Sequence, residues 1–294
     1  MIPGFLLLSS HLGDPERRIL TPAQLRLLTQ RMQEAAFPSL EGELTHRELR
    51  ALGYGDEMAD RILGLLQQRD LLELYLSRAE KAGCYPLTRG DDRYPALMRR
   101  RLGGECPGCL FCKGDPEILS GPAAALVGSR DLSPENWRFA REAGRQAALA
   151  GVTLVSGNAR GADRTAQNAC LEAGGRVISI VADSLTDKAP VPDVLWISQE
   201  DFDAPFSRFR ALSRNRLIHA MGYLTLVAQC SLDSGGTWSG TTQNLKALWS
   251  PVAVFRDGSP ASLELEARGA SLIDLSDLQA LSGLQEPQMN FLKP

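Results

Sequence analysis

The stretch GVTLVSGNARGADRTAQNACLEAGG, residues 151–175, decides which fold this chain is expected to adopt. It begins with an apolar run over Val152–Val155, continues through a small-residue loop over Ser156–Gly161, and ends in an alanine-rich helix that stops at Gly174 and Gly175. A strand that leads through such a loop into a helix presents free backbone N–H groups and the positive end of the helix dipole to an anion. The stretch therefore predicts a seat for a phosphate group.

Apolar runs and helical stretches alternate on both sides of this segment, after Pro122. The expected strands are Ala123–Val127, Val152–Val155, Val177–Val181, Val194–Ile197, Leu224–Val227, Val252–Phe255 and Ser271–Leu275. The expected helices are Pro134–Ala150, Ala162–Ala173, Leu212–Met221, Thr241–Trp249 and Ala261–Ala267. Continuous apolar strands indicate a parallel sheet that is covered on both faces. The pattern predicts an α/β fold, a Rossmann-like doubly wound and mostly parallel sheet over 122–284, followed by a tail at 285–294.

Ligands of such sheets bind beyond the carboxyl ends of the strands, where loops lead into helices. Three loops meet this condition: Gly128-Ser129-Arg130, the loop from Ser156 to Asp163, and SLDSGGTWSGTTQN over 231–244, which is expected to enter its helix at Thr241. Glycines in these loops let a ligand approach the backbone, although turn geometry alone also explains single glycines. Arg130 and Arg160 add positive charge, so the loops together predict one phosphate pocket. Asp163 is expected to cap its helix rather than to act as a catalyst.

The segment FSRFRALSRNRLIHAMG, residues 206–222, carries four arginines within nine residues and no acid. In a chain with a formal net charge of −3, this local patch is suited to binding phosphates. Phe206 and Phe209 are candidates for stacking on bases, with packing as the alternative. The arginines are Arg208, Arg210, Arg214 and Arg216.

The overall balance of 32 Lys+Arg against 35 Asp+Glu in 294 residues excludes a protein coated in basic charge, and leaves only a local basic strip for a nucleic acid. The first residues show no charged leader and no cleavage site, and no run approaches the ~20 apolar residues of a membrane span. We therefore expect a cytoplasmic protein with no membrane partner.

Residues 1–82 are rich in Leu, Arg, Glu and Gln at helical spacing and predict a small all-helical domain, with a helix starting at Thr21-Pro22. Within it, THRELRALGYGDEMADRILGLL over 45–66 suits a helix-hairpin or SAM-like bundle. Such a bundle either contacts DNA at its turn or only packs, and the turn at Gly53–Gly55 lacks the basic or aromatic cluster that would favour DNA.

A connector over 83–121 leads into the core domain and is dense in turn residues. Its run Arg99-Arg100-Arg101 is expected to be a solvated helix end, with a nucleic-acid role as the alternative, and Leu110-Phe111 is a candidate strand. Three cysteines in CPGCLFC, together with Cys84, are either ligands of zinc or an iron–sulfur cluster or reduced, buried thiols. The absence of a nearby His favours thiols and no metal. The three are Cys106, Cys109 and Cys112.

Residues that commonly carry out catalysis are not grouped in any familiar spacing. The chain shows no Ser/His/Asp set, no paired carboxylates at useful spacing and no P-loop lysine. His219 is expected to be a packed or exposed residue rather than a base. The sequence therefore favours a binding protein over an enzyme.

The three loops and the arginine segment, in this order, resemble the DNA-processing protein A family (DprA, also called Smf) of the LOG-like Rossmann proteins. The matching stretches are GSRDLS at 128–133, VSGNARGADRTAQNACLEAGG at 155–175, SRNRLIHAM at 213–221 and SGG at 234–236. Gln167 stands where the family's motif has a His.

This resemblance implies a bacterial protein that binds single-stranded DNA, forms a homodimer, needs no nucleotide or metal cofactor, and helps to load a RecA-type recombinase during natural transformation. Carried over to this chain, it implies that Arg130 and the segment 214–216 contact phosphates while the loops at 156–161 and 234–236 close the pocket. The complete expected phosphate-binding set is Gly128, Ser129, Arg130, Ser156, Gly157, Arg160, Gly161, Arg208, Arg210, Arg214, Asn215, Arg216, Ser234, Gly235, Gly236 and Thr237.

Two other classes of function remain open. One is a nucleotide-binding sensor, including one in antiphage defence, or a LOG-like phosphoribohydrolase. The hydrolase is disfavoured because Asn244 stands where the LOG-like motif carries its Glu, and an amide cannot act as a general base. The other class is a structural protein that kept the fold without its ligand, and the arginine segment argues against it.

Overall fold

The computed structural model describes residues 3–37, 40, 44–199 and 201–283. The chain forms two compact units: the first holds the residues up to 113 with two later segments, 184–187 and 198–204, and the second holds the remainder. The domain limits expected at 82/83 and 121/122 stay a prediction, and the tail expected at 285–294 lies outside the described residues.

The first unit begins with helices that pack through leucines at helical spacing. Among the residues described up to position 82 these helices are α1 (Pro3–Ser9), α2 (Pro22–Glu34), α3 (His46–Ala51), α4 (Asp56–Leu66) and α5 (Arg69–Lys81). The expected start of α2 is confirmed, because the Thr21 hydroxyl accepts a hydrogen bond from the Gln24 N–H and Pro22 is the first helical residue. Gly53, with φ +83°, makes the turn between α3 and α4 as the sequence predicts.

The first unit also contains an antiparallel strand pair, β1 (Tyr85–Thr88) and β2 (Cys109–Lys113), of which only β2 was expected. Between them lies α6 (Ala96–Leu102), whose last turn carries the three arginines, as predicted for a helix end. Cys109 and Cys112 are three residues apart on β2, so their side chains point to opposite faces of the pair. The cysteines are buried free thiols, and within the described residues no group of His, Cys, Asp or Glu is placed to hold a metal ion.

The segment 198–204 belongs to the first unit because it forms buried hydrogen bonds there. The Asp201 carboxylate accepts hydrogen bonds from the Ser10 hydroxyl at 2.8 Å and from the Leu12 N–H at 3.2 Å. The Tyr75 hydroxyl donates to the Asp203 carboxylate at 2.7 Å, and its ring packs on Phe202. The buried polar groups of the segment 198–204 and those of Ser10, Leu12 and Tyr75 thus satisfy one another's hydrogen bonds.

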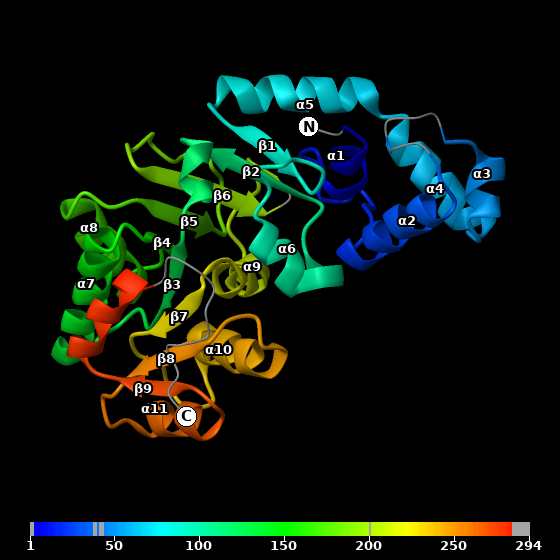
Figure 1. The fold of residues 1–294 in the computed structure, drawn as a ribbon. Helices are drawn as coiled ribbons and strands as arrows, with labels where there is room; N and C mark the ends of the chain where they lie inside the picture. Colours follow the sequence, from blue (N-terminus) through cyan, green and yellow to red (C-terminus); the bar gives the residue numbers. More distant parts are fainter. Residues whose placement is uncertain (1–2, 38–39, 41–43, 200, 284–294) are drawn as a thin grey trace. The chain divides into compact units, whose positions relative to one another are not determined.

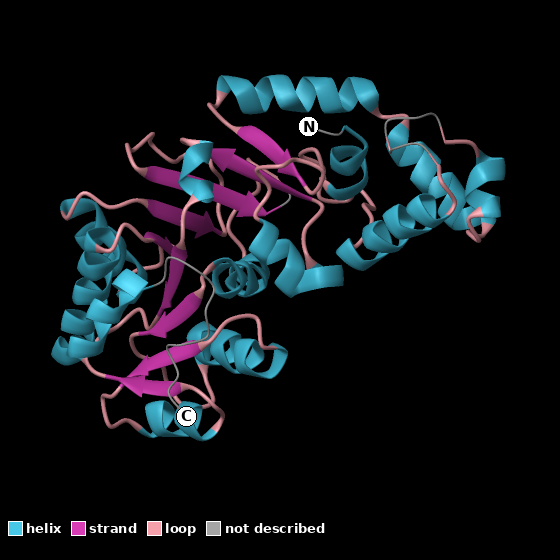
Figure 2. Cartoon of the chain, in the orientation of Figure 1, coloured by secondary structure: helices cyan, strands magenta, loops and turns pink. Residues whose placement is uncertain are grey.

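The second unit is an α/β sheet whose strands run, among the described residues, in the order β6-β5-β4-β3-β7-β8-β9 (Figures 1 and 2). The pairs β3–β4, β4–β5, β3–β7, β7–β8 and β8–β9 are parallel. The strands are β3 (Ala123–Val127), β4 (Thr153–Ser156), β5 (Val177–Val181), β6 (Val194–Gln199), β7 (Leu224–Val227), β8 (Val252–Phe255) and β9 (Ser271–Ile273). The Rossmann-like fold expected from the sequence is confirmed.

Helices cover both faces of this sheet (Figure 1). Helices α7 (Pro134–Leu149) and α8 (Ala162–Glu172) lie on one face, and α9 (Arg208–Met221) and α10 (Gly235–Ala247) on the other. A main apolar core lies around α7 and α8, where Phe139 stacks on Phe255 at 4.6 Å between ring centroids. The chain leaves β3 toward β4 on one side and returns to β7 on the other, so the strand order reverses between β3 and β7. Ligands of such sheets bind at this reversal.

Two helices begin earlier than the sequence predicted, and both changes matter for the site. Helix α9 begins at Arg208 rather than Leu212, because the Ser207 hydroxyl caps the Arg210 N–H at 3.0 Å. Helix α10 begins at Gly235 rather than Thr241. Its glycines have low helix propensity, which favours a loop by sequence alone, but packing against α9 overrides that preference. Helix α11 (Pro260–Ala267) lies close to its expected place.

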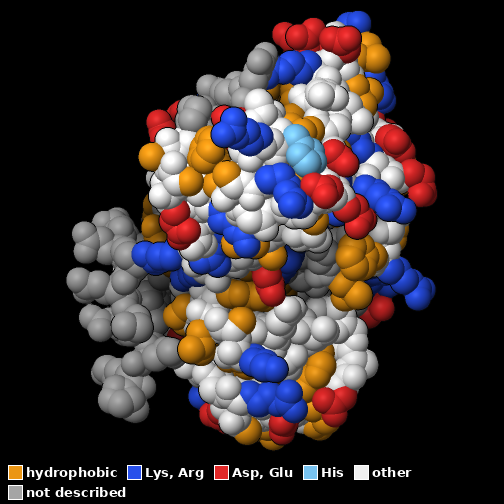
Figure 3. Space-filling model, turned by 90° about the vertical axis from the view of Figure 1, so that its right-hand side faces the viewer, with side chains coloured by type: hydrophobic (Ala, Val, Ile, Leu, Met, Phe, Trp, Pro, Cys, Tyr) orange, Lys and Arg blue, Asp and Glu red, His pale blue; other side chains and the backbone are white. Residues whose placement is uncertain are grey.

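The surface face seen in Figure 3 mixes Lys and Arg with Asp and Glu and shows no uniformly basic area. Within the described residues, no helix combines the length and the apolar character that crossing a membrane requires.

Candidate nucleic-acid interface

A pocket of about 480 Å³ opens at the reversal of strand order between β3 and β7. Its walls come from the loops after β3, β4 and β7, from one face of α9 and from the first turn of α10. Its volume lies within the range of ordinary ligand sites. The predicted residues that line it are Gly128, Ser129, Arg130, Arg208, Arg214, Asn215, Ser234, Gly235, Gly236 and Thr237.

Backbone hydrogen bonds join the three loops into one frame. The Ser129 N–H donates to the Gln229 carbonyl at 2.9 Å, and the Ala162 N–H donates to the Ser129 carbonyl at 3.1 Å. Gly161, with φ +86°, lets α8 start against this loop, since an added Cβ would lie 2.4 Å from the Ser129 and Arg130 carbonyl oxygens. The loop after β3 is therefore held from both sides.

Arg214 is buried, although the sequence predicts a phosphate ligand at this position. One guanidinium N–H donates to the Gly157 carbonyl at 3.0 Å, and a Cβ on Gly157 would lie 1.5 Å from that guanidinium group. Asp163 accepts hydrogen bonds from the Gly157 and Ala159 N–H groups, each at 3.2 Å. Asp163 thus holds the loop rather than capping α8, whose N-cap residue is Gly161, and the expected helix cap is wrong.

Burial dominates the charges of this pair. It raises the pKa of Asp163, against the opposing attraction of Arg214 and the hydrogen bonds from Ala159 and Gly157. It lowers the pKa of Arg214, against the attraction of Asp163 and Asp183. Both shifts mean that lost hydration outweighs the mutual attraction, as is common for buried ion pairs. Arg214 is therefore best described as a buried cation that shapes the β4–α8 loop at the pocket wall.

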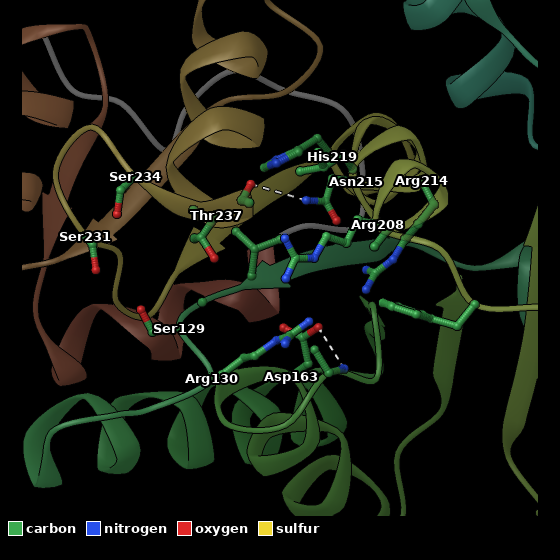
Figure 4. A pocket seen from close by; sticks show the side chains of 18 residues that line it. Ser129, Arg130, Asp163, Arg208, Arg214, Asn215, His219, Ser231, Ser234 and Thr237 are labelled. Atoms are coloured by element: carbon green, nitrogen blue, oxygen red, sulfur yellow. Dashed lines mark hydrogen bonds between the residues drawn. The ribbon is translucent and has the colours of Figure 1, made fainter. Parts of the chain in front are cut away.

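Arg130 and Arg208 are the exposed cations of the pocket. Their side chains extend into the same hollow, Arg130 from the loop after β3 and Arg208 from α9 (Figure 4). Neither takes part in the ion pairs found among the described residues. Two guanidinium groups that face one cavity without acidic partners form a suitable seat for an anionic oxygen.

Six predicted residues do not line the pocket. The Ser156 hydroxyl donates to the Leu126 carbonyl at 2.9 Å and is buried. Gly157 and Gly161 shape the loop as described above. Arg160 is exposed and pairs with Asp131 at 2.8 Å. Arg210 and Arg216 lie on other faces of α9.

The structure adds eight pocket residues that the expected set lacks, and helical spacing identifies Leu212 and His219 among them. Leu212, Asn215 and His219 follow Arg208 at intervals that place all four on one face of α9, whereas Arg210 and Arg216 fall elsewhere. The spacing was visible in the sequence, but the helix start at Arg208 was not. The added lining residues are Val127, Ala159, Asp163, Phe206, Ala211, Leu212, His219 and Ser231.

Two residues singled out by their motifs are buried near the pocket and do not line it. Gln167 lies in the core and its amide donates to the Ser179 hydroxyl at 3.3 Å. Asn244 is fully buried, and its carbonyl oxygen accepts a hydrogen bond from the Ser250 N–H at 2.9 Å. Neither side chain is placed to act on a bound ligand directly.

The sequence of this chain is similar to those of known proteins from several bacteria. Protein Smf of Escherichia coli (strain K12) is 31% identical over 219 residues, covering 70% of this chain and 58% of the relative. DNA processing protein DprA of Streptococcus pneumoniae is 28% identical over 155 residues, covering 49% of this chain and 54% of the relative. The chain thus spans a little over half the length of these relatives.

Solved structures show the same fold. DNA processing protein A from Streptococcus pneumoniae superposes with a TM-score of 0.68 at 21% identity, covering 86% of this chain and 95% of that one. The protein of the same name from Helicobacter pylori, reported for its single-stranded DNA binding mode, gives 0.58 at 24% identity over 68% and 94%. The sequence model described as DNA recombination-mediator protein A matches residues 86–282, so the chain belongs to that family.

Proposed function

We propose that this protein binds single-stranded DNA during DNA processing in recombination and seats backbone phosphates between Arg130 and Arg208. The observation that carries the proposal is the pair of exposed guanidinium groups facing one pocket at the reversal of the sheet. Single strands are bound largely through such phosphate contacts, aided by stacking of bases on aromatic side chains. Phe206 at the rim supplies an exposed aromatic ring.

The proposal extends to two partners, in keeping with the family. A second copy of the chain would form a homodimer, and a RecA-type recombinase would receive the bound strand, including in natural transformation. Sedimentation of the purified protein tests the dimer. Co-sedimentation of the recombinase with protein-coated single strands tests the transfer, and a recombinase that is excluded from those strands would contradict it.

The position and hydrogen bonds of Asn244 support a binding role without catalysis. Its amide is committed to Ser250 and lies outside the pocket, so no carboxylate or amide from this position reaches a ligand there. Competition with mononucleotides distinguishes a single-strand binder from a nucleotide sensor, because a sensor would bind the mononucleotide more tightly than the single strand.

The test is fluorescence anisotropy with a labelled oligothymidylate at low salt. Arg130→Ala and Arg208→Ala should each weaken binding by about tenfold, as expected for the loss of a charge-assisted phosphate contact. Arg160→Ala is the matched control, since Arg160 is exposed but paired with Asp131 away from the pocket. Unchanged binding in the first two variants would defeat the proposed phosphate seat.

A further inference from the structure

A group of arginines that the proposed function does not use lies on the surface of the first unit. Residues 89–101 carry five arginines and two acids, and α2 adds Arg26 to the same surface. Helix α6 ends at the turn Gly103–Glu105, and α2 packs against this turn. An added Cβ on Gly104 would lie 3.4 Å from the Arg26 guanidinium group, so that group rests on the turn. Arginines from two elements distant in sequence therefore share one surface.

Backbone carbonyl groups hold two further guanidinium groups beside this turn. Arg99 Nη1 donates to the Arg89 carbonyl at 3.0 Å, and Arg89 Nη1 lies 3.5 Å from the Cys106 carbonyl oxygen. Arg100 follows Arg99 and is exposed on the last turn of α6. Four cations are thus gathered around one short turn. We call them the α6 arginine surface, which consists of Arg26, Arg89, Arg99 and Arg100.

The α6 arginine surface lacks acidic partners. Within the part of the chain that the structure describes, none of its members forms an ion pair. The carboxylate of Asp91 is committed to its own turn, because it accepts hydrogen bonds from the Thr88 N–H at 2.7 Å and from the Thr88 hydroxyl at 2.6 Å. Two other acids, Asp92 and Glu105, leave the stretch with an excess of positive charge. Like charges held together repel one another, and a ligand with several closely spaced negative charges relieves that repulsion.

We propose that the α6 arginine surface binds the phosphate backbone of duplex DNA, through residues that are distinct from those of the pocket. Neighbouring guanidinium groups fit successive phosphates, to which each donates paired hydrogen bonds.

The apolar side chains of the first unit favour a duplex over a single strand as the ligand. Sites for single strands combine cations with aromatic rings on which the bases stack. Among the described residues of this unit, the exposed large apolar side chains are Leu27, Leu71 and Leu74, and none is aromatic. The bases of a duplex are already stacked on one another, so cations alone supply the contacts that its backbone needs. The proposal therefore goes beyond the binding of single strands.

The test is fluorescence anisotropy of the full chain with a labelled blunt-ended duplex and, separately, with the labelled oligothymidylate. Arg26→Ala and Arg100→Ala each remove one cation of the α6 arginine surface. Arg47→Ala is the matched control, because Arg47 is exposed on α3, far from α6 in the same unit (Figure 1). Thermal unfolding reports whether each variant is folded.

We expect Arg26→Ala and Arg100→Ala each to weaken duplex binding by about tenfold at low salt, through the loss of one charge-assisted phosphate contact. Each should also make the slope of log K against log salt concentration shallower by about 0.9 for the duplex. Binding of the oligothymidylate should keep its wild-type strength in both variants. Arg47→Ala should match the wild type with both probes.

Three results would overturn the duplex site while the phosphate seat in the pocket stands. The first is a wild type that binds no duplex, and the second is a duplex affinity that Arg26→Ala and Arg100→Ala leave unchanged or that Arg47→Ala weakens equally. The third is an equal loss on the duplex and the oligothymidylate, which would assign the surface to single strands.

Discussion

At the scale of single residues, the position of Gly157 requires a glycine because the Arg214 guanidinium group packs directly against it. The glycine leaves room for a guanidinium group that a Cβ would displace, and its own carbonyl accepts the guanidinium hydrogen bond. Since the arginine is buried, it cannot move into water without breaking that bond and depriving the buried Asp163 of its nearby positive charge. This glycine therefore has a packing role that glycine content alone does not reveal.

Gly157→Ala should lower the free energy of unfolding by about 1–3 kcal/mol, because it disrupts a buried hydrogen bond to a charged group. Urea unfolding measures the change. Gly64→Ala is the control: Gly64 lies in α4 with nothing within 4 Å of an added Cβ, so its replacement should raise stability by about 0.5–1 kcal/mol. A stability of Gly157→Ala equal to that of the wild type would show that Arg214 repacks without cost.

His219 makes a second prediction at this scale, on pH. The folded protein holds its pKa near 3, below the ordinary 6.5, so below pH 6.5 the unfolded chain binds a proton that the folded chain does not. The stabilising contribution is complete above 6.5 and falls as the pH drops toward 3. Wild type should lose about 2 kcal/mol from this group between pH 6.5 and about pH 5.

The measurement is urea unfolding of wild type and His219→Asn at both pH values. The other two histidines are common to both proteins, so their contributions cancel in the comparison. The variant should lose less stability than the wild type on acidification. Parallel pH dependence of the two proteins would show that His219 is protonated in the folded state.

At the scale of elements, the sequence predicts the strands of the sheet well and the starts of α9 and α10 poorly. The strand positions followed from continuous apolar runs, and Leu224–Val227 and Val252–Phe255 match β7 and β8. The start of α10 was missed because its stability comes from packing on α9 and not from the propensities of Gly235 and Gly236. Without that start, the pocket residues Gly235, Gly236 and Thr237 could not be assigned to a helix.

The arginine segment shows the same limit. Its charge predicted a phosphate site, and the structure brings Arg208 into the pocket beside Arg130. Composition could not separate Arg214, which is buried against Gly157, from Arg208, which is open to solvent. That separation depends on the loop after β4, a contact distant in sequence.

Gly240→Ala tests how closely α10 packs on α9. Alanine inside a helix normally stabilises by about 0.5–1 kcal/mol, but here its Cβ would lie 3.1 Å from a His219 ring held by Asn244 and Thr225. We expect a net stability change below about 1 kcal/mol, because the gain in helix propensity offsets the crowding of the ring. Thermal unfolding measures the change. A loss of several kcal/mol would show that the His219 ring cannot shift to make room.

At the scale of the whole molecule, the proposed binding of single-stranded DNA would bring a polyanion to a chain with a formal net charge of −3, against its overall field. The reversal of strand order solves this locally, since it brings the loops after β3 and β7 together beside the N-terminal end of α9. Affinity should then depend on a few guanidinium groups and not on general basic charge.

The salt dependence of binding measures how many such groups contact phosphates. For single strands, the slope of log K against log salt concentration changes by about 0.7 for each phosphate contact. Arg130→Ala and Arg208→Ala should each make the slope shallower by about that amount, because each removes one contact. Arg160→Ala should leave the slope unchanged, since Arg160 pairs with Asp131 and does not line the pocket. An unaltered slope in both Arg130→Ala and Arg208→Ala would mean that the phosphates lie outside this pocket.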